Sequence, residues 1–164
     1  MSRVPEHSRG TWRDGWYVLP YQVIFRDVDA YGHVNNAVFF TYFEWVRTLL
    51  WFELTRFGGA TDIGFIVAHA ECDYRRPLFL EPIDLCIRVG EVRTSSFETL
   101  YEVRKGDGEV AATGKVVVVL YDWERDAKKP IDDELRRKLS ECGAGSSSHA
   151  SRSPSPSAPP DSSA

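Results

Sequence analysis

The sequence predicts an α+β domain in which an antiparallel sheet of five strands wraps around one long buried helix, followed by a short C-terminal helix. Two observations carry this prediction. The segment 37–54 is apolar on nearly every side at helical spacing, which indicates a helix surrounded by other structure. Five segments are rich in β-branched and aromatic residues, and short turn signals separate the last four, as in antiparallel sheets.

The first strand is predicted over residues 16–25, which read Trp-Tyr-Val-Leu-Pro-Tyr-Gln-Val-Ile-Phe. Such residues favour sheets, and Pro20 should either start the strand or lie at an edge, because proline has no N–H to donate.

The buried helix is predicted over residues 37–54, where Phe39, Phe43, Val46 and Leu50 recur at helical spacing. Either Asn35 or Asn36 is the expected N-cap, and the pair Gly58-Gly59 ends the region. The helix carries a narrow polar stripe that includes Glu44, which we expect to be held by a hydrogen bond.

The rest of the domain is predicted to be strands and one amphipathic helix. Apolar residues at i, i+4 and i+8, with charges between them, indicate the final helix. The strands are expected over 65–74, 83–92, 97–104 and 110–121, and the helix over 130–142.

The domain is expected to span residues 16–142, between two irregular segments. Residues 1–15 show no periodicity and predict a loose N-terminal arm. Residues 143–164 hold nine Ser and four Pro, and their only aliphatic side chains are those of Ala. Such a segment cannot bury enough apolar surface to offset its ordering entropy, so a disordered tail is predicted.

Composition excludes several classes of protein. A net charge of −4 offers no basic field for nucleic acid or an anionic membrane, and no apolar run has the length of a membrane span. The three cysteines, Cys72, Cys86 and Cys142, show no CxxC spacing. An odd number of unpatterned cysteines is typical of a reduced, cytoplasmic protein.

The loop between the first strand and the long helix concentrates polar residues, and several interpretations compete. It reads Asp27-Val-Asp29-Ala-Tyr-Gly32-His33-Val-Asn35-Asn36. A calcium loop is disfavoured, because Tyr31 and Val38 stand where that motif needs ligands. A transition-metal site is also disfavoured, because no second histidine has ligand spacing, so no metal is predicted. Asx turns that position a helix, or a catalytic site, remain.

The catalytic interpretation rests on two neighbouring groups. A carboxylate wedged against an apolar helix is partly desolvated, which suits a base or nucleophile. The first N–H groups of the following helix have no intrahelical partner, and with the helix dipole they form a site for an oxyanion. A base and an oxyanion donor are the minimum for acyl transfer.

The same loop, continued into Ala-Val-Phe-Phe-Thr-Tyr-Phe-Glu-Trp-Val-Arg, resembles the signature of the 4-hydroxybenzoyl-CoA thioesterase family. The likeness extends through Asp-Tyr-Arg-Arg-Pro-Leu at 73–78 and spans about residues 17–140. The resemblance implies the hotdog fold and acyl-CoA thioesterase activity, with no metal or redox cofactor. It also implies a homodimer or homotetramer with sites at the subunit interface.

The resemblance assigns roles to individual loop residues. It implies that Asp29 is the general base or nucleophile and that the backbone N–H of Asn36 polarises the thioester carbonyl. The expected loop-supporting residues are Asp27, Gly32, His33 and Asn35.

The resemblance also implies a coenzyme A contact. Candidate contacts are Arg93, Thr94 and Ser95 in one turn, and Arg75 and Arg76 at a strand end. Two alternatives stay open: a thioesterase acting on acyl carrier protein, and a hotdog module that binds acyl thioesters without hydrolysing them.

Overall fold

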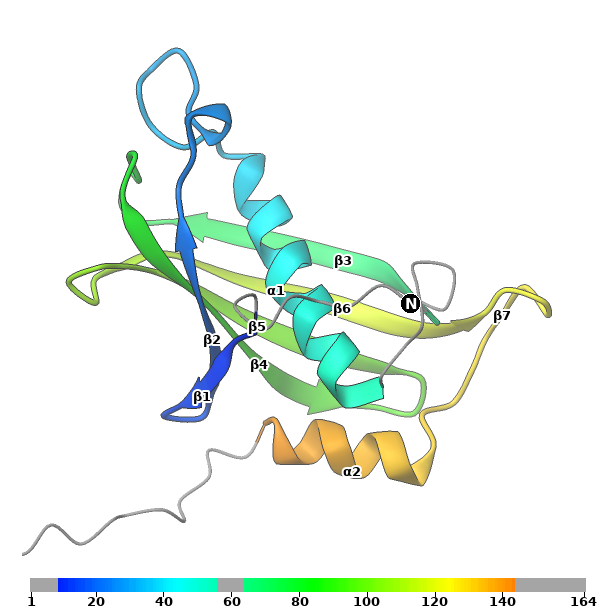
Figure 1. Cartoon of the computed structure of the whole chain (residues 1–164). Helices are drawn as coiled ribbons and strands as arrows, with labels where there is room; N and C mark the ends of the chain where they lie inside the picture. Colours follow the sequence, from blue (N-terminus) through cyan, green and yellow to red (C-terminus); the bar gives the residue numbers. More distant parts are fainter. Residues whose placement is uncertain (1–8, 56–63, 144–164) are drawn as a thin grey trace, which may run out of the picture.

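The computed structural model describes residues 9–55 and 64–143 (Figure 1). The Gly58-Gly59 pair and the serine- and proline-rich residues 144–164 therefore lie outside the described residues, as do the first eight residues of the predicted arm.

The described residues form a seven-stranded antiparallel sheet rather than the predicted five-stranded one. Its order is β1-β2-β4-β5-β6-β3, and β7 pairs with the end of β6. The strands are β1 (Thr11–Arg13), β2 (Trp16–Gln22), β3 (Phe65–Tyr74), β4 (Pro82–Val92), β5 (Ser96–Lys105), β6 (Val110–Asp122) and β7 (Ala127–Lys128).

The two additional strands are short and lack the hydrophobic signal on which the prediction depended. Strand β1 lies in the predicted arm, with all three residues exposed, and pairs with β2 through a turn at Asp14 and Gly15. The first strand is also shorter than predicted. Strand β2 ends at Gln22, and Phe25–Asp27 form a single 3₁₀ turn. Pro20 pairs with Asp84 of β4 and lies beyond the end of β1, where β2 is an edge.

The predicted long helix is confirmed as α1 (Val38–Thr55). Its buried side chains face the sheet, and the ring of Phe43 stacks on Tyr101 of β5 with centroids 4.4 Å apart. Gly114 of β6 makes this contact feasible, because a Cβ there would overlap the Phe43 ring. The opposite face is open: Phe40 and Trp45 are 38% and 41% exposed. Within the described residues, α1 thus lies on the sheet rather than being enclosed by it.

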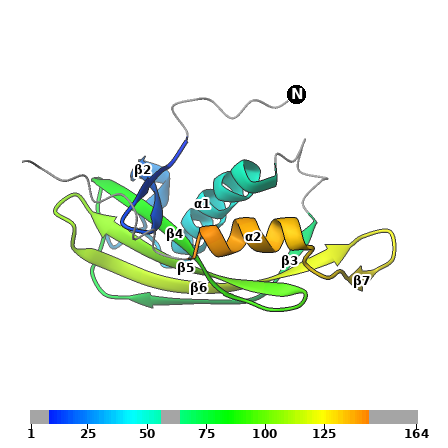
Figure 2. The same ribbon diagram turned by 90° about the horizontal axis from the view of Figure 1, so that it is seen from below.

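The second helix, α2 (Asp133–Glu141), lies on the same face of the sheet as α1 (Figure 2). Asp132 caps it by accepting a 2.8 Å hydrogen bond from the Leu135 N–H. No helix among the described residues has the length and apolar character needed to span a membrane.

The connection between β3 and β4 positions the site. Because β3 lies at one edge and β4 lies beside β2, residues 75–81 must cross the ends of β6 and β5. The crossing begins where the N–H groups of Arg75 and Arg76 both donate to the carbonyl of Ala111, and it passes the start of α1.

Candidate active site

Asp27 anchors the polar loop to the core. Its side chain is 8% exposed, and Oδ2 accepts hydrogen bonds from the Tyr42 hydroxyl at 2.8 Å and from the Tyr21 hydroxyl and the Ile24 N–H at 3.2 Å. Burial, followed by the hydrogen bond to Asp27, raises the pKa of Tyr42 above its ordinary range. The arrangement fits the loop-supporting role expected of Asp27.

The loop closes on itself by backbone hydrogen bonds. The Asp29 N–H donates to the His33 carbonyl at 3.0 Å, and the Gly32 N–H donates to the Asp29 carbonyl at 3.0 Å. Gly32 has φ of +86°, a conformation that costs other residues about 1–2 kcal/mol. At the end of the loop, the Asn35 N–H donates to the Asp27 carbonyl at 2.9 Å.

The Asp29 side chain is half-buried and keeps one oxygen free. Its Oδ1 accepts a 2.8 Å hydrogen bond from the Tyr31 N–H, forming an Asx turn. Its Oδ2 accepts no hydrogen bond from the described residues. The His33 ring stacks against Tyr31, with centroids 6.2 Å apart, and its Nδ1 lies 3.4 Å from the Val34 carbonyl oxygen. His33 therefore braces the loop.

Just before α1, the N–H of Asn36 is available. The Asn35 side chain accepts a 2.9 Å hydrogen bond from the Ala37 N–H, which makes Asn35 rather than Asn36 the capping side chain. The Val38 N–H donates to the Asn35 carbonyl at 3.0 Å. Among residues 35–38, Asn36 alone has an N–H without an acceptor in the described part of the chain. Its carbonyl accepts a 2.9 Å hydrogen bond from the Tyr74 hydroxyl.

Asp29 and Asn36 line the same cavity of about 480 Å³. The loop and the first turn of α1 form one side, and the connection after β3 forms the other. The two sides are joined where the Val34 N–H donates to the carbonyl of the buried Leu78 at 2.8 Å. The remaining lining residues are Tyr31, His33, Val34, Phe39, Tyr74, Arg75, Arg76 and Pro77.

Two arginines add positive charge to this cavity. Both Arg75 and Arg76 are exposed. The Arg76 guanidinium pairs with Glu109 at 2.7 Å, whereas Arg75 Nη2 donates only to the Thr113 hydroxyl at 3.3 Å. Arg75 therefore keeps most of its donors for an anionic group.

The other candidate coenzyme A contacts lie elsewhere. Arg93 and Thr94 belong to the β4–β5 turn, at the opposite end of the eleven-residue β4 from the polar loop. That length corresponds to roughly 30 Å. Arg93 pairs with Glu91 at 2.7 Å, the Thr94 carbonyl accepts from the Ile131 N–H at 2.8 Å, and the Ser95 carbonyl accepts from the Leu120 N–H at 2.9 Å. One chain does not bring this turn to its own Asp29.

Sequence reasoning missed three tyrosines. Tyr21 and Tyr42 are read from the sequence as strand and core residues, and only the fold shows that both hydroxyls meet on Asp27. Tyr74 packs edge-on against Phe39 with ring centroids 5.1 Å apart, while its hydroxyl fixes the Asn36 carbonyl. The only signal for Tyr74 was its place in the Asp-Tyr-Arg-Arg segment. One expectation was wrong: Glu44 is exposed and has no hydrogen-bond partner among the described residues.

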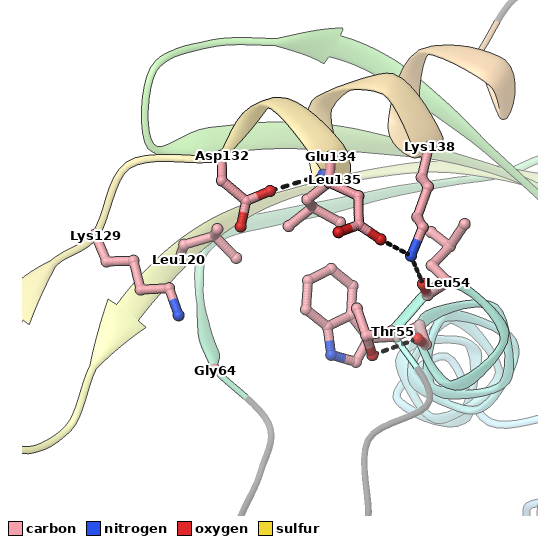
Figure 3. A pocket seen from close by; sticks show the side chains of 10 residues that line it. Leu54, Thr55, Gly64, Leu120, Lys129, Asp132, Glu134, Leu135 and Lys138 are labelled. Carbon is pink, nitrogen blue, oxygen red and sulfur yellow. Dashed lines mark hydrogen bonds and ion pairs between the residues drawn. The ribbon is translucent and has the colours of Figure 1, made fainter.

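A second cavity, of about 360 Å³, lies between the end of α1 and α2 (Figure 3). Three of its four charged side chains hold α2 or join it to α1. Lys138 Nζ contacts Glu134 at 2.8 Å and donates to the Leu54 carbonyl at 3.0 Å, and Asp132 caps α2. We interpret it as a structural junction. In the part of the chain that the structure describes, no three His, Cys, Asp or Glu side chains are grouped to hold a metal.

Comparisons with known proteins agree with the fold. Residues 23–139 match the model of the thioesterase-like superfamily. The uncharacterized protein YsmA of Bacillus subtilis is 30% identical over 118 residues, covering 71% of this chain and 80% of that protein. The crystal structure of a thioesterase from Thermus thermophilus, complexed with coenzyme A and zinc, is 31% identical. It has a TM-score of 0.67 and covers 76% of this chain and 92% of the other.

A predicted thioesterase from Bacillus stearothermophilus has the same fold, with a TM-score of 0.74 and 21% identity over 78% of this chain and 96% of its own.

Proposed function

Because the chain belongs to the thioesterase-like superfamily and is a thioester hydrolase, we propose that it hydrolyses an acyl-CoA to the free acid and coenzyme A, with Asp29 as the reacting carboxylate. The observation that carries this proposal is the cavity that Asp29 shares with the Asn36 N–H, which has no acceptor among the described residues. The positive charge of Arg75 and Arg76 in the same cavity supports coenzyme A, with its phosphates, as the thiol half of the substrate.

In the proposed reaction, the thioester carbonyl oxygen accepts a hydrogen bond from the Asn36 N–H, and the positive end of the α1 dipole faces it. Asp29 takes a proton from water, and the resulting hydroxide adds to the carbonyl carbon. The tetrahedral oxyanion then collapses, the C–S bond breaks, and the departing thiolate takes up the proton. No metal or redox cofactor has a part in this scheme.

In a second route, the free Oδ2 of Asp29 attacks the carbonyl itself. The thiolate leaves, an acyl-aspartyl anhydride forms, and water hydrolyses the anhydride. A single turnover in ¹⁸O-labelled water detects an anhydride that water opens at the aspartyl carbonyl. Only the anhydride route, with water attacking the aspartyl carbonyl, places label in the Asp29 carboxylate, which mass spectrometry of the active-site peptide detects.

Two copies of the chain are proposed to form the working unit, either alone or within a tetramer. The β4–β5 turn is too far from its own Asp29 to contact the same substrate. If Arg93, Thr94 and Ser95 bind coenzyme A, they therefore serve the site of another copy. The proposed location is the cytoplasm, in agreement with three free cysteines.

A thiol-release assay over short, long, branched and aryl acyl-CoAs tests the proposal. Asp29→Asn should lower kcat/KM by about 10²–10⁴-fold, the usual contribution of a general base. Asp122→Asn is the matched control, because Asp122 makes the same kind of Asx turn, accepting a 3.1 Å hydrogen bond from the Glu124 N–H at the far end of β6. Its activity should match wild type, and the wild-type rate should persist in EDTA.

The same assay distinguishes the alternatives. Full activity of Asp29→Asn would remove Asp29 from the mechanism. Release from acyl carrier protein thioesters alone would replace coenzyme A by that carrier. No release from any thioester, together with retained binding, would make the domain a binding module.

A further inference from the structure

Arg47 is a buried cation without an acidic partner among the described residues. It lies on α1, and its side chain is 9% exposed. Nη1 donates a 3.1 Å hydrogen bond to the Tyr101 hydroxyl, and Cζ lies 5.9 Å from the centroid of the Phe65 ring. Nε is buried with no hydrogen-bond partner. None of the ion pairs among the described residues includes Arg47.

The hydrogen-bond chain that begins at Arg47 contains no negative charge. The Tyr101 hydroxyl lies 2.8 Å from the Thr99 hydroxyl, which donates to the Val116 carbonyl at 3.3 Å. Tyr101 therefore accepts from Arg47 and donates to Thr99. A buried guanidinium with neutral partners alone retains a large desolvation penalty, and no described residue of the chain supplies its counter-charge.

The side of the domain beyond Arg47 is open. Phe65 belongs to β3, a ten-residue edge strand that pairs only with β6 among the described strands. Val67 on β3 is 46% exposed, and Phe40, on the flank of α1 that also carries Arg47, is 38% exposed. A ten-residue edge strand with unpaired backbone groups and exposed apolar side chains beside it is suited to a covering partner.

The acid that suits Arg47 lies one turn earlier on the same helix. Glu44 is exposed and has no partner among the described residues. In a two-fold interface, a contact from residue i to residue j is repeated from j to i. A helix that carries an unpaired acid and an unpaired base three residues apart is therefore complementary to a second copy of itself.

The register of the sheet places these residues near the centre of such an interface. The series of hydrogen bonds that begins at Arg47 ends at the carbonyl of Val116. Val116 pairs with Ala70, near the midpoint of β3. If two β3 strands pair antiparallel about that midpoint, the two α1 helices run antiparallel and pass each other near Glu44 and Arg47. We propose that the Arg47 guanidinium of each copy is neutralised by Glu44 of a second copy bound along β3.

This inference rests on the two-copy assembly of the proposed function, but not on its chemistry. A carboxylate on the substrate is the other available counter-ion. It is disfavoured because Arg47 does not line the cavity that holds Asp29.

Charge reversal tests the reciprocal pair by sedimentation equilibrium without substrate. Arg47→Glu and Glu44→Arg each create two like-charge contacts per dimer and should each raise the dimer Kd by about 100-fold or more. An equimolar mixture of the two variants should associate within about 10-fold of wild type, because each heterodimer regains both opposite-charge pairs. Glu124→Arg, which reverses an exposed charge in another turn, should leave the dimer Kd unchanged.

Circular dichroism shows whether each variant folds. If Arg47→Glu does not fold, the exposed Glu44→Arg still carries the test. In the Glu44→Arg variant, the new arginine faces Arg47 of the second copy. Adding Arg47→Met removes that like charge, so the double variant should recover part of the lost dimer affinity.

Four results would each overturn the proposal. The first two are a monomeric wild type and single variants that dimerise like wild type. The others are no recovery of affinity in the mixture, or, where Arg47→Glu does not fold, no recovery in the double variant. A dimeric Arg47→Met that loses only hydrolysis of acyl groups ending in a carboxylate would assign the acid to the substrate. Because assembly is measured without turnover, these outcomes are separate from those of the thiol-release assay.

Discussion

The Tyr42 hydroxyl donates a 2.8 Å hydrogen bond to Oδ2 of Asp27, which joins the second turn of α1 to the residue from which the polar loop starts. The loop returns to the same place, because the Asn35 N–H donates to the Asp27 carbonyl at 2.9 Å. Both ends of the loop that carries Asp29 are therefore fixed to one buried residue, and the orientation of Asp29 depends on a carboxylate that takes no part in the proposed chemistry.

Removing the Tyr42 hydroxyl should weaken the fold and the site together. Tyr42→Phe leaves a buried carboxylate short of a donor, so the free energy of unfolding in urea should fall by about 1–3 kcal/mol. Tyr21→Phe is the matched control, since the bond from Tyr21 is longer, at 3.2 Å, and its side chain is only half-buried. Its loss should be the smaller. Equal losses would show that Asp27 does not depend on the buried phenol.

Two glycines with the same backbone conformation separate strain from function. Gly32 and Gly108 have φ of +86° and +88°, and a Cβ would meet nothing within 4 Å at either position. Gly32→Ala and Gly108→Ala should each cost about 1–2 kcal/mol of stability, from backbone strain alone. Only Gly32→Ala should also lower kcat, by about 10-fold or more, because it moves Asp29. A similar loss of kcat in both variants would contradict this expectation.

Arg75 and Arg76 should differ in their effect on substrate binding. Arg75→Gln removes a cation with no carboxylate partner and should raise KM for acyl-CoA about 10-fold, the usual effect of losing a hydrogen bond to a charged group. Arg76→Gln should have a smaller effect, because Arg76 already pairs with Glu109 at 2.7 Å.

An acyl-pantetheine substrate, which lacks the nucleotide, provides the control for this pair of variants. Its KM should be the same for wild type and Arg75→Gln. An increase in KM for both substrates would assign Arg75 to the acyl or pantetheine part of the site.

The sequence predicted the main elements of the fold because their signals are hydrophobic and local. The apolar run gave α1 to within one residue at each end, and the four later strands agree closely with β3 to β6. Strands β1 and β7 were missed, since a strand of two or three exposed residues has no apolar pattern and is stabilised by its neighbour.

The site was predictable only in part. The residues of the loop motif are contiguous, so their grouping follows from the chain itself, and Gly32 indeed has positive φ. The contacts of Asp27 with two tyrosines depend on how β2 and α1 pack, which a single sequence does not specify. The expected hydrogen bond of Glu44 was wrong because the open face of α1 could not be foreseen.

Stability should fall at alkaline pH because of buried phenols and thiols. Burial, and then the hydrogen bond to Glu53, raises the pKa of Tyr17, and burial raises the pKa of the Cys86 thiol to about 12. Both groups stay protonated in the folded state at pH values where they ionise in the unfolded chain, in which the thiol has a pKa of about 9 and the phenol a pKa of about 10.

The unfolding free energy should thus be level below about pH 8. It should then decrease as pH rises toward the folded-state pKa values, by at most about 1.4 kcal/mol per pH unit for each group. Urea unfolding at a series of pH values measures this slope. Tyr17→Phe removes one buried phenol and should make the slope shallower above about pH 10, while Tyr31→Phe, at a position 86% exposed, should leave it unchanged. A wild-type slope in Tyr17→Phe would mean that the Tyr17 phenol ionises as freely in the folded protein as in the unfolded chain.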